Sequence, residues 1–167
     1  MSHPALGLSP ADPSVGRTDA AARLRRERAR IAPLALKAAV SADPSLTERY
    51  DETMLRRFLR DHEQHIEQLA RALETGEERF VTEYAEWLVP IYRRRHVPVK
   101  DSATLLIALR QAAVAVLTPD DGQALGLLVE AWLKRLRLHR AIPGDHKGNK
   151  VARFIWKGAG ILDETVV

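Results

Sequence analysis

The feature that most constrains the fold is a stripe of apolar residues that recurs every three or four positions in the middle of the chain. This spacing places the side chains on one face of an α-helix, and such a face must be buried against another element. The stripe predicts a helix from about Leu46 to Leu73, which Gly76 ends as a C-terminal cap. Its members are Met54, Leu55, Phe58, Leu59, Ile66, Leu69 and Leu73.

One more helix is predicted before this one in the chain, and another is predicted after it. Residues 18–40 are rich in Ala, Leu and Arg, which favour the helix, and an interruption is expected at Pro33. The arginines of this segment are expected to form a solvated face, and they are Arg23, Arg25, Arg26, Arg28 and Arg30. The helix after Gly76 carries Phe80, Tyr84, Trp87 and Ile91 on one face. Pro90 should kink this helix and Val97-Pro98 should end it.

The remaining signals complete an all-α chain. Residues 99–117 are apolar around most of a helix circumference, which predicts a central position. A further helix begins with Thr118 as N-cap and Pro119 at the first helical position, and it extends to about His139. No segment alternates between polar and apolar residues as a strand would. The expected fold is therefore a single-domain helical bundle of about five main helices.

The domain prediction places this bundle at residues 18–142. Residues 1–17 contain three prolines and no apolar period, so they are expected to form a disordered leader. Residues 143–167 form a tail in which two aromatic side chains, Phe154 and Trp156, stand within a basic run. This tail is expected to pack back on the bundle or on a partner.

Composition excludes several classes of protein. The chain has 167 residues, enough for one domain with a hydrophobic core, and it contains no cysteine. Disulfides, thiolate metal sites and cysteine nucleophiles are therefore excluded. No apolar run reaches the about 20 residues that a membrane span needs, and the N-terminus lacks a signal pattern. A cytoplasmic protein without membrane contact is expected.

Charge is distributed unevenly and leaves two interpretations of the C-terminal region. Residues 48–86 hold eleven acids and six bases, whereas residues 134–157 hold eight bases and one acid. The basic block suits nucleic acid or another anion, and its candidate residues are Lys134, Arg135, Arg137, Arg140, Lys147, Lys150, Arg153 and Lys157. However, Val151, Phe154, Ile155 and Ile161 are apolar enough to favour burial. We favour docking of the tail over nucleic-acid binding.

Candidate chemistry is sparse. His62 and His65 share a helix face, but they match no zinc or di-iron motif, so two surface histidines are expected rather than a metal site. The aromatic residues Phe80, Tyr84 and Trp87 could border a flat cofactor such as a haem or bilin, although aromatics at helical spacing usually belong to the core. No nucleophile or acid–base pair is recognised, so no enzyme activity and no cofactor are predicted.

One corner of the chain resembles a known family. Arg93 to Arg95, Val97-Pro98, Asp101, Leu106 and Arg110, with Trp87 upstream, resemble the helical N-terminal sensor domains of RsbR-type bacterial stress regulators. In those domains a glycine stands where this chain has His96. The resemblance implies a globin-like fold, mostly without haem, and Tyr92 lies near the position where related haem sensors place a histidine. Tyr92 and His96 are therefore weak cofactor candidates.

The resemblance also implies a function. It predicts a non-enzymatic sensory or regulatory protein that forms a homodimer, acts through protein–protein contacts and signals by a shift in helix packing. A regulator that binds nucleic acid through the basic C-terminal block is the first alternative. A haem, bilin or metal protein built on the histidines or the aromatic face is the second.

Overall fold

A computed structural model describes residues 16–139 and confirms the all-α prediction. The helices in this part of the chain are α1 (Thr18–Ala42), α2 (Leu46–Arg49), α3 (Glu52–Thr75), α4 (Arg79–Arg94), α5 (Val99–Val114) and α6 (Pro119–Leu138). The predicted tail at 143–167 and all but the last two residues of the predicted leader lie outside the described residues.

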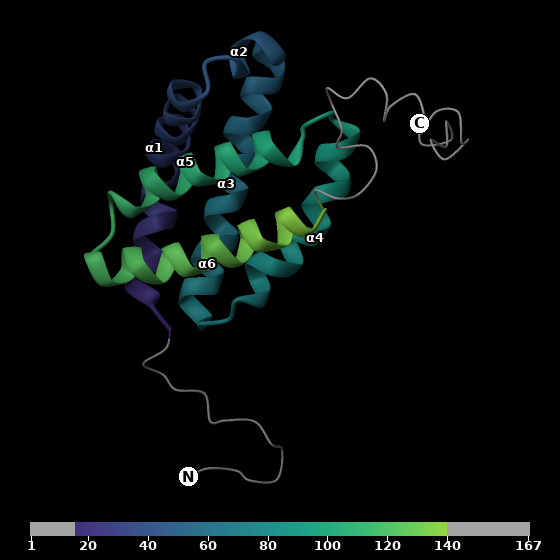
Figure 1. Cartoon of the computed structure of the whole chain (residues 1–167). Coiled ribbons are helices and arrows are strands. Elements are labelled where there is room, and N and C mark those ends of the chain that lie inside the picture. The colour runs from purple at the N-terminus through teal and green to yellow at the C-terminus, as the bar shows by residue number, and fades with distance from the viewer. Residues whose placement is uncertain (1–15, 140–167) are drawn as a thin grey trace, which may run out of the picture.

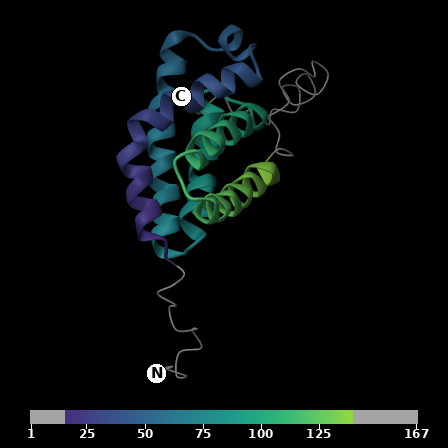
Figure 2. The same ribbon diagram turned by 90° about the vertical axis from the view of Figure 1, so that its left-hand side faces the viewer.

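The helices form two crossed layers. α1 and α3 lie side by side and antiparallel, and α5 and α6 run across them (Figures 1 and 2). α1 makes its most extensive contacts with α3 and α5, whereas α4 packs against α6 and α3. The residues predicted to be central, on α5, are accordingly buried between α1 and α6, with Leu105, Leu106 and Leu109 in the core.

Small residues allow α1 to approach its neighbours closely. Its buried face consists mostly of alanines, and the large core side chains come from the other helices. The alanines are Ala20, Ala21, Ala32, Ala35 and Ala39. Phe58 and Trp132 are almost completely buried, and removing such a ring from water contributes about 2–3 kcal/mol.

Two details of the predicted helices are wrong. α1 continues through Pro33 to Ala42, because Pro33 faces solvent while Ile31, Ala32 and Ala35 stay packed in the core. Tertiary packing here outweighs the local cost of proline. The helix predicted from Leu46 is also divided, since α2 ends at Arg49 and Asp51 caps a new helix by accepting from the Met54 amide at 2.8 Å.

The predicted helix ends are confirmed at several places. Gly76 caps α3 in the left-handed region with φ 72°, and the Thr118 side chain caps α6 by accepting from the Asp121 amide. His96 also adopts a positive φ of 57°, directly before the Val97-Pro98 turn. A left-handed backbone is the conformation that glycine adopts most easily, so this turn has the geometry that a glycine would favour.

Arg17, which was predicted to belong to the leader, is fixed to the bundle. Its amide donates to the Leu73 carbonyl at 2.7 Å. Its guanidinium pairs with Asp120 at 2.6 Å and with Asp121 at 2.9 Å, at the start of α6. The described chain therefore begins by joining the end of α3 to the start of α6.

Candidate functional site

The two histidines of α3 point into the core instead of into solvent. His62 is 1% exposed and His65 is 4% exposed. The prediction of two surface histidines is therefore wrong. Both residues lie on the buried face that the apolar stripe defines, between Phe58 and Ile66, and this position in the stripe was the available signal.

His65 connects two tyrosines of α4. Its Nδ1 lies 3.2 Å from the Tyr84 hydroxyl and its Nε2 lies 3.2 Å from the Tyr92 hydroxyl. The Tyr92 hydroxyl donates its one hydrogen to Asp61 at 3.1 Å, so it can only accept from His65. His65 therefore carries its proton on Nε2, and its Nδ1 accepts from Tyr84. We call these residues, with Arg95, the His65 network.

The network is neutral at its centre and charged at its edge. Burial lowers the pKa of His65 far below its usual range, with a smaller contribution from neighbouring His62, and burial raises the pKa values of Tyr84 and Tyr92. Burial also raises the pKa of Asp61, although Arg95 opposes this by pairing with the carboxylate at 2.8 Å. Because the imidazole and both phenols are neutral, the two hydrogen bonds of His65 to α4 are uncharged, and the charges lie at Asp61 and Arg95.

Two tryptophans extend this network in opposite directions. Trp132 of α6 is buried, with its ring centroid 5.0 Å from that of His65 and 5.3 Å from that of Tyr84 in edge contacts. Trp87 stacks on Tyr84 at 5.4 Å but is 59% exposed. The expectation that Trp87 belongs to the core is therefore wrong, because it lies on the solvent side of Tyr84. A row of touching rings leads from the protein surface to His65 and Trp132.

Two buried donors or acceptors beside the network are not satisfied. Within the described residues, His62 Nε2 and Trp132 Nε1 have no partner at hydrogen-bond geometry, although the Leu105 backbone lies close enough to act on the His62 ring. The other ring nitrogen of His62 lies 3.4 Å from the Ala32 carbonyl oxygen. Each unsatisfied group costs on the order of 1–3 kcal/mol, so the packing around His62 and Trp132 is less favourable than the core could provide.

The polar groups of the network are one imidazole, two phenols, one carboxylate and one guanidinium. Among residues 16–139, no group of three or more His, Asp or Glu side chains is arranged to hold a metal ion. His65 is closed in by two tyrosines, a histidine and a tryptophan, and no serine or threonine hydroxyl is among its hydrogen-bond partners or ring contacts.

The predicted cofactor residues do not form one group. Tyr84 and Tyr92 meet at His65, but Phe80 is half-buried under the Arg79 guanidinium, which lies 4.8 Å from its ring centroid. His96 is exposed at the turn after α4. Sequence reasoning missed Asp61 and named Arg95 only as part of the basic corner, because a half-buried ion pair between residues 34 positions apart has no recognisable spacing.

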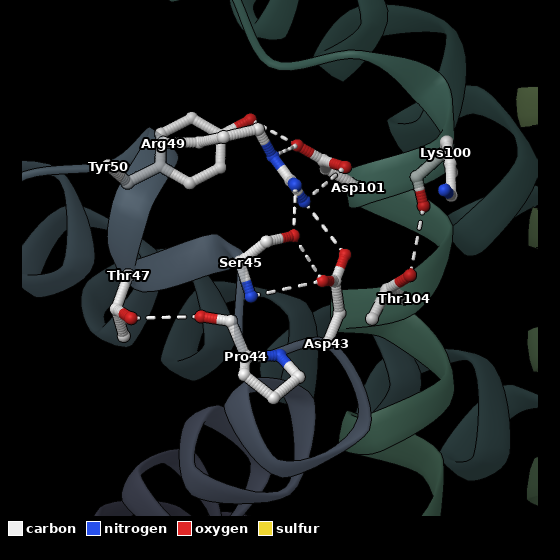
Figure 3. Close-up of polar contacts among 9 residues, drawn as sticks. All are labelled: Asp43, Pro44, Ser45, Thr47, Arg49, Tyr50, Lys100, Asp101 and Thr104. Atoms are coloured by element: carbon white, nitrogen blue, oxygen red, sulfur yellow. Dashed lines mark hydrogen bonds and ion pairs between the residues drawn. The ribbon is translucent and has the colours of Figure 1, made fainter.

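A second polar cluster fixes the ends of three other helices (Figure 3). The buried carboxylate of Asp101, in the first turn of α5, accepts from both Nε and Nη2 of Arg49 at 3.1 Å and from the Tyr50 hydroxyl at 2.6 Å. Arg49 also pairs with Asp43 at 2.8 Å. Burial, helped by the Asp101 contact, raises the pKa of Tyr50, and hydrogen bonds from Ser45 and Arg49 lower the pKa of Asp43. The charges of Asp43, Arg49 and Asp101 are all paired, so the cluster holds α1, α2 and α5 together.

The predicted anion-binding residues fall partly on α6. Lys134, Arg135 and Arg137 are exposed near the end of that helix, and Arg135 lies 3.7 Å from Glu86 of α4. The other five candidates, Arg140, Lys147, Lys150, Arg153 and Lys157, lie outside the described residues. Nucleic-acid binding stays a prediction.

None of the helices in the described part of the chain combines the length and apolar character of a membrane span. The sequence matches no family model and no curated protein, and the fold matches no solved structure. A function must therefore be inferred from the geometry of this chain.

Proposed function

We propose that the chain is a regulatory protein that forms a homodimer through α4 and converts this contact into a change in helix packing. The proposed contact surface is the α4 ridge, defined as Phe80, Tyr84, Trp87 and Ile91. The observation that carries the proposal is the position of Trp87. Its side chain is 59% exposed and its ring stacks on Tyr84, whose hydroxyl is hydrogen-bonded to the buried His65.

An exposed tryptophan is an effective anchor for a protein contact. Tryptophan buries about 150–250 Å² when it is covered, and it is enriched among residues that dominate binding energy. At about 25 cal/mol per Å², covering the exposed part of two such rings favours association by a few kcal/mol. The neighbouring ridge residues Phe80 and Ile91 are half-buried and extend the apolar surface along α4.

The ridge has charges that suit pairing with a second copy. A two-fold axis that crosses α4 at a right angle near Trp87 would place the α4 helices of two copies antiparallel. Glu83 of one copy would then lie about one turn from Arg94 of the other. Both side chains are exposed in the single chain.

The signal would pass through Tyr84. A contact that moves Trp87 also moves the stacked Tyr84 ring, and the Tyr84 hydroxyl is the donor to His65. His65 touches Trp132, so α6 would respond to a contact on α4. The unsatisfied atoms of His62 and Trp132 reduce the stability of the observed packing relative to an alternative. The resemblance to RsbR-type sensor domains supports the same class of function.

Sedimentation velocity over a range of protein concentrations tests the proposal. The full chain should dimerise, and Trp87→Ala should weaken dimerisation at least about tenfold. Leu127→Ala is the matched control, because Leu127 is 68% exposed on α6, and it should dimerise as the wild type does. The His65 ring resonances should shift on dimerisation. A monomeric wild-type chain, or a Trp87→Ala variant that dimerises normally, would refute the proposed interface.

A further inference from the structure

A groove between α1 and α5 combines basic and apolar residues. Its volume is about 430 Å³, and α1 lines one side while the end of α5 and the turn that follows it line the other. The α1 side carries Arg23, Arg26, Glu27, Arg30, Ile31 and Leu34. This groove lies apart from the α4 ridge, so a ligand of the groove does not require the proposed dimer.

The arginines of the groove follow one side of α1. Arg23, Arg26 and Arg30 stand three and four residues apart, so they cover two helical turns, or about 10 Å. Within residues 16–139, Arg26 has no ion-pair partner and Arg30 has only Glu27, at 3.5 Å. Arg23 forms no ion pair there either, although it acts electrostatically on Asp121. Three cations and one carboxylate leave the groove with an excess of positive charge.

The remaining lining is aliphatic. Ala112, Ala115 and Val116 provide apolar surface above the buried Ile31, and Leu34 at the edge is 49% exposed. Among residues 16–139, no aromatic side chain lines the groove, so this part of the chain offers no surface there for stacking a nucleotide base. A ligand that satisfies both parts of the lining must carry negative charge along one side and aliphatic groups along the other.

We propose that this groove binds an acidic amphipathic helix of a partner protein. Carboxylates at three- and four-residue spacing on such a helix would match the spacing of the three arginines, and its aliphatic side chains would cover Leu34 and Val116. A small inorganic anion would use only the arginines and leave Leu34 exposed. The charge pattern therefore sets the orientation of the partner, and the apolar contact provides the affinity.

A designed peptide of about 18 residues provides the probe, with leucines on one face and glutamates on its flank. Fluorescence anisotropy measures its binding to the full chain, and a peptide with lysine in place of glutamate is the charge control. We expect the double variant Arg26→Glu, Arg30→Glu to weaken binding at least about tenfold. The double variant Arg57→Glu, Arg60→Glu reverses two exposed arginines of α3 and should bind as the wild type does.

Two single variants separate the two parts of the lining. Leu34→Ser should weaken binding about threefold by removing aliphatic contact, and Glu27→Gln should strengthen it by a similar factor by removing the opposing charge. Since Glu27→Gln is expected to bind the peptide more tightly, its result does not depend on the stability of the double variant. Competition with poly(dT) measures the affinity of the groove for nucleic acid.

The proposal is overturned by any of three results. The first is unchanged binding in both the Arg26/Arg30 double variant and Glu27→Gln. The second is an equal loss in the Arg57/Arg60 double variant, which would show a response to total charge alone. The third is strong competition by poly(dT) together with no effect of Leu34→Ser, which would make the groove a surface for polyanions. None of these results concerns dimerisation through Trp87.

Discussion

Acidification should destabilise this protein through its two buried histidines. Burial lowers the pKa of His62 to about 4, from 6.5 when exposed, and it lowers the pKa of His65 well below that ordinary value. The unfolded chain therefore binds more protons than the folded chain once the pH falls below about 6.5. The free energy of unfolding is at its full value above this pH and decreases as the pH falls towards 4.

The size of the effect follows from the two pKa values of His62. Between about pH 7.5 and about pH 5, His62 alone should reduce the free energy of unfolding by about 2 kcal/mol. His65 is buried among Tyr84, Tyr92 and Trp132 and should add a loss in the same direction. The loss is large for a domain whose total stability is about 5–15 kcal/mol.

Urea unfolding followed by far-UV circular dichroism measures the effect at a series of pH values. His62→Gln keeps a donor for the Ala32 carbonyl but cannot be protonated, so its stability should fall by about 2 kcal/mol less than that of the wild type over this range. His96→Asn is the control, because it removes an exposed imidazole at a position with positive φ, which asparagine tolerates. The pKa of Asp61 is raised, which acts in the opposite direction, but this contribution is common to all three proteins and cancels.

Two results would refute this reasoning. One is a wild-type free energy of unfolding that stays constant from neutral pH to about pH 5. The other is a His62→Gln variant whose pH dependence equals that of the wild type while His96→Asn flattens it. Either result would mean that the histidines are not buried in neutral form as described.

Three further predictions concern stability and are measured by urea unfolding at neutral pH. Asp101→Ala should cost about 3 kcal/mol because it leaves Arg49 and Tyr50 without their buried acceptor, and a cost below about 1 kcal/mol would contradict the role of this cluster. Gly76→Ala should cost about 1 kcal/mol because of its positive φ, whereas Gly126→Ala, where an added Cβ meets nothing within 4 Å, should stabilise α6 by up to about 1 kcal/mol. Trp132→Phe should change stability by less than about 1 kcal/mol because it removes an unsatisfied N–H, while Trp132→Ala should cost about 3–5 kcal/mol, and equal effects would contradict this interpretation.

The sequence predicted the helices well because their signals are local. The apolar stripe of α3, the Gly76 and Thr118 caps and the Val97-Pro98 break each depend on residues within one or two turns. The effect of Pro33 on α1 was predicted wrongly because it depends on contacts with residues that are distant in the sequence. A proline interrupts an isolated helix, but the alanine face of α1 is held by α3 and α5, and sequence spacing does not report this support.

The candidate site could be predicted only in part. His62, His65, Tyr84, Trp87 and Tyr92 were identified as residues of interest, but which of them would meet depends on how α3 packs against α4 and α6. The helical period places His65 on the buried face, whereas the general preference of histidine for the surface suggested the reverse. Trp87 was assigned to the core because aromatic residues at helical spacing are usually buried. Its exposure instead follows from its position at the edge of the apolar face of α4.

The polar members of the His65 network all belong to one helical hairpin, since they lie between Asp61 and Arg95. The loop between α3 and α4 is short, so little chain entropy is lost when these two helices meet. Contacts of low sequence separation also form early, whereas Trp132 must arrive from α6, which comes after the whole of α5. During folding, the hydrogen-bonded link should therefore assemble first while still open to water, and docking of α6 should then dehydrate it.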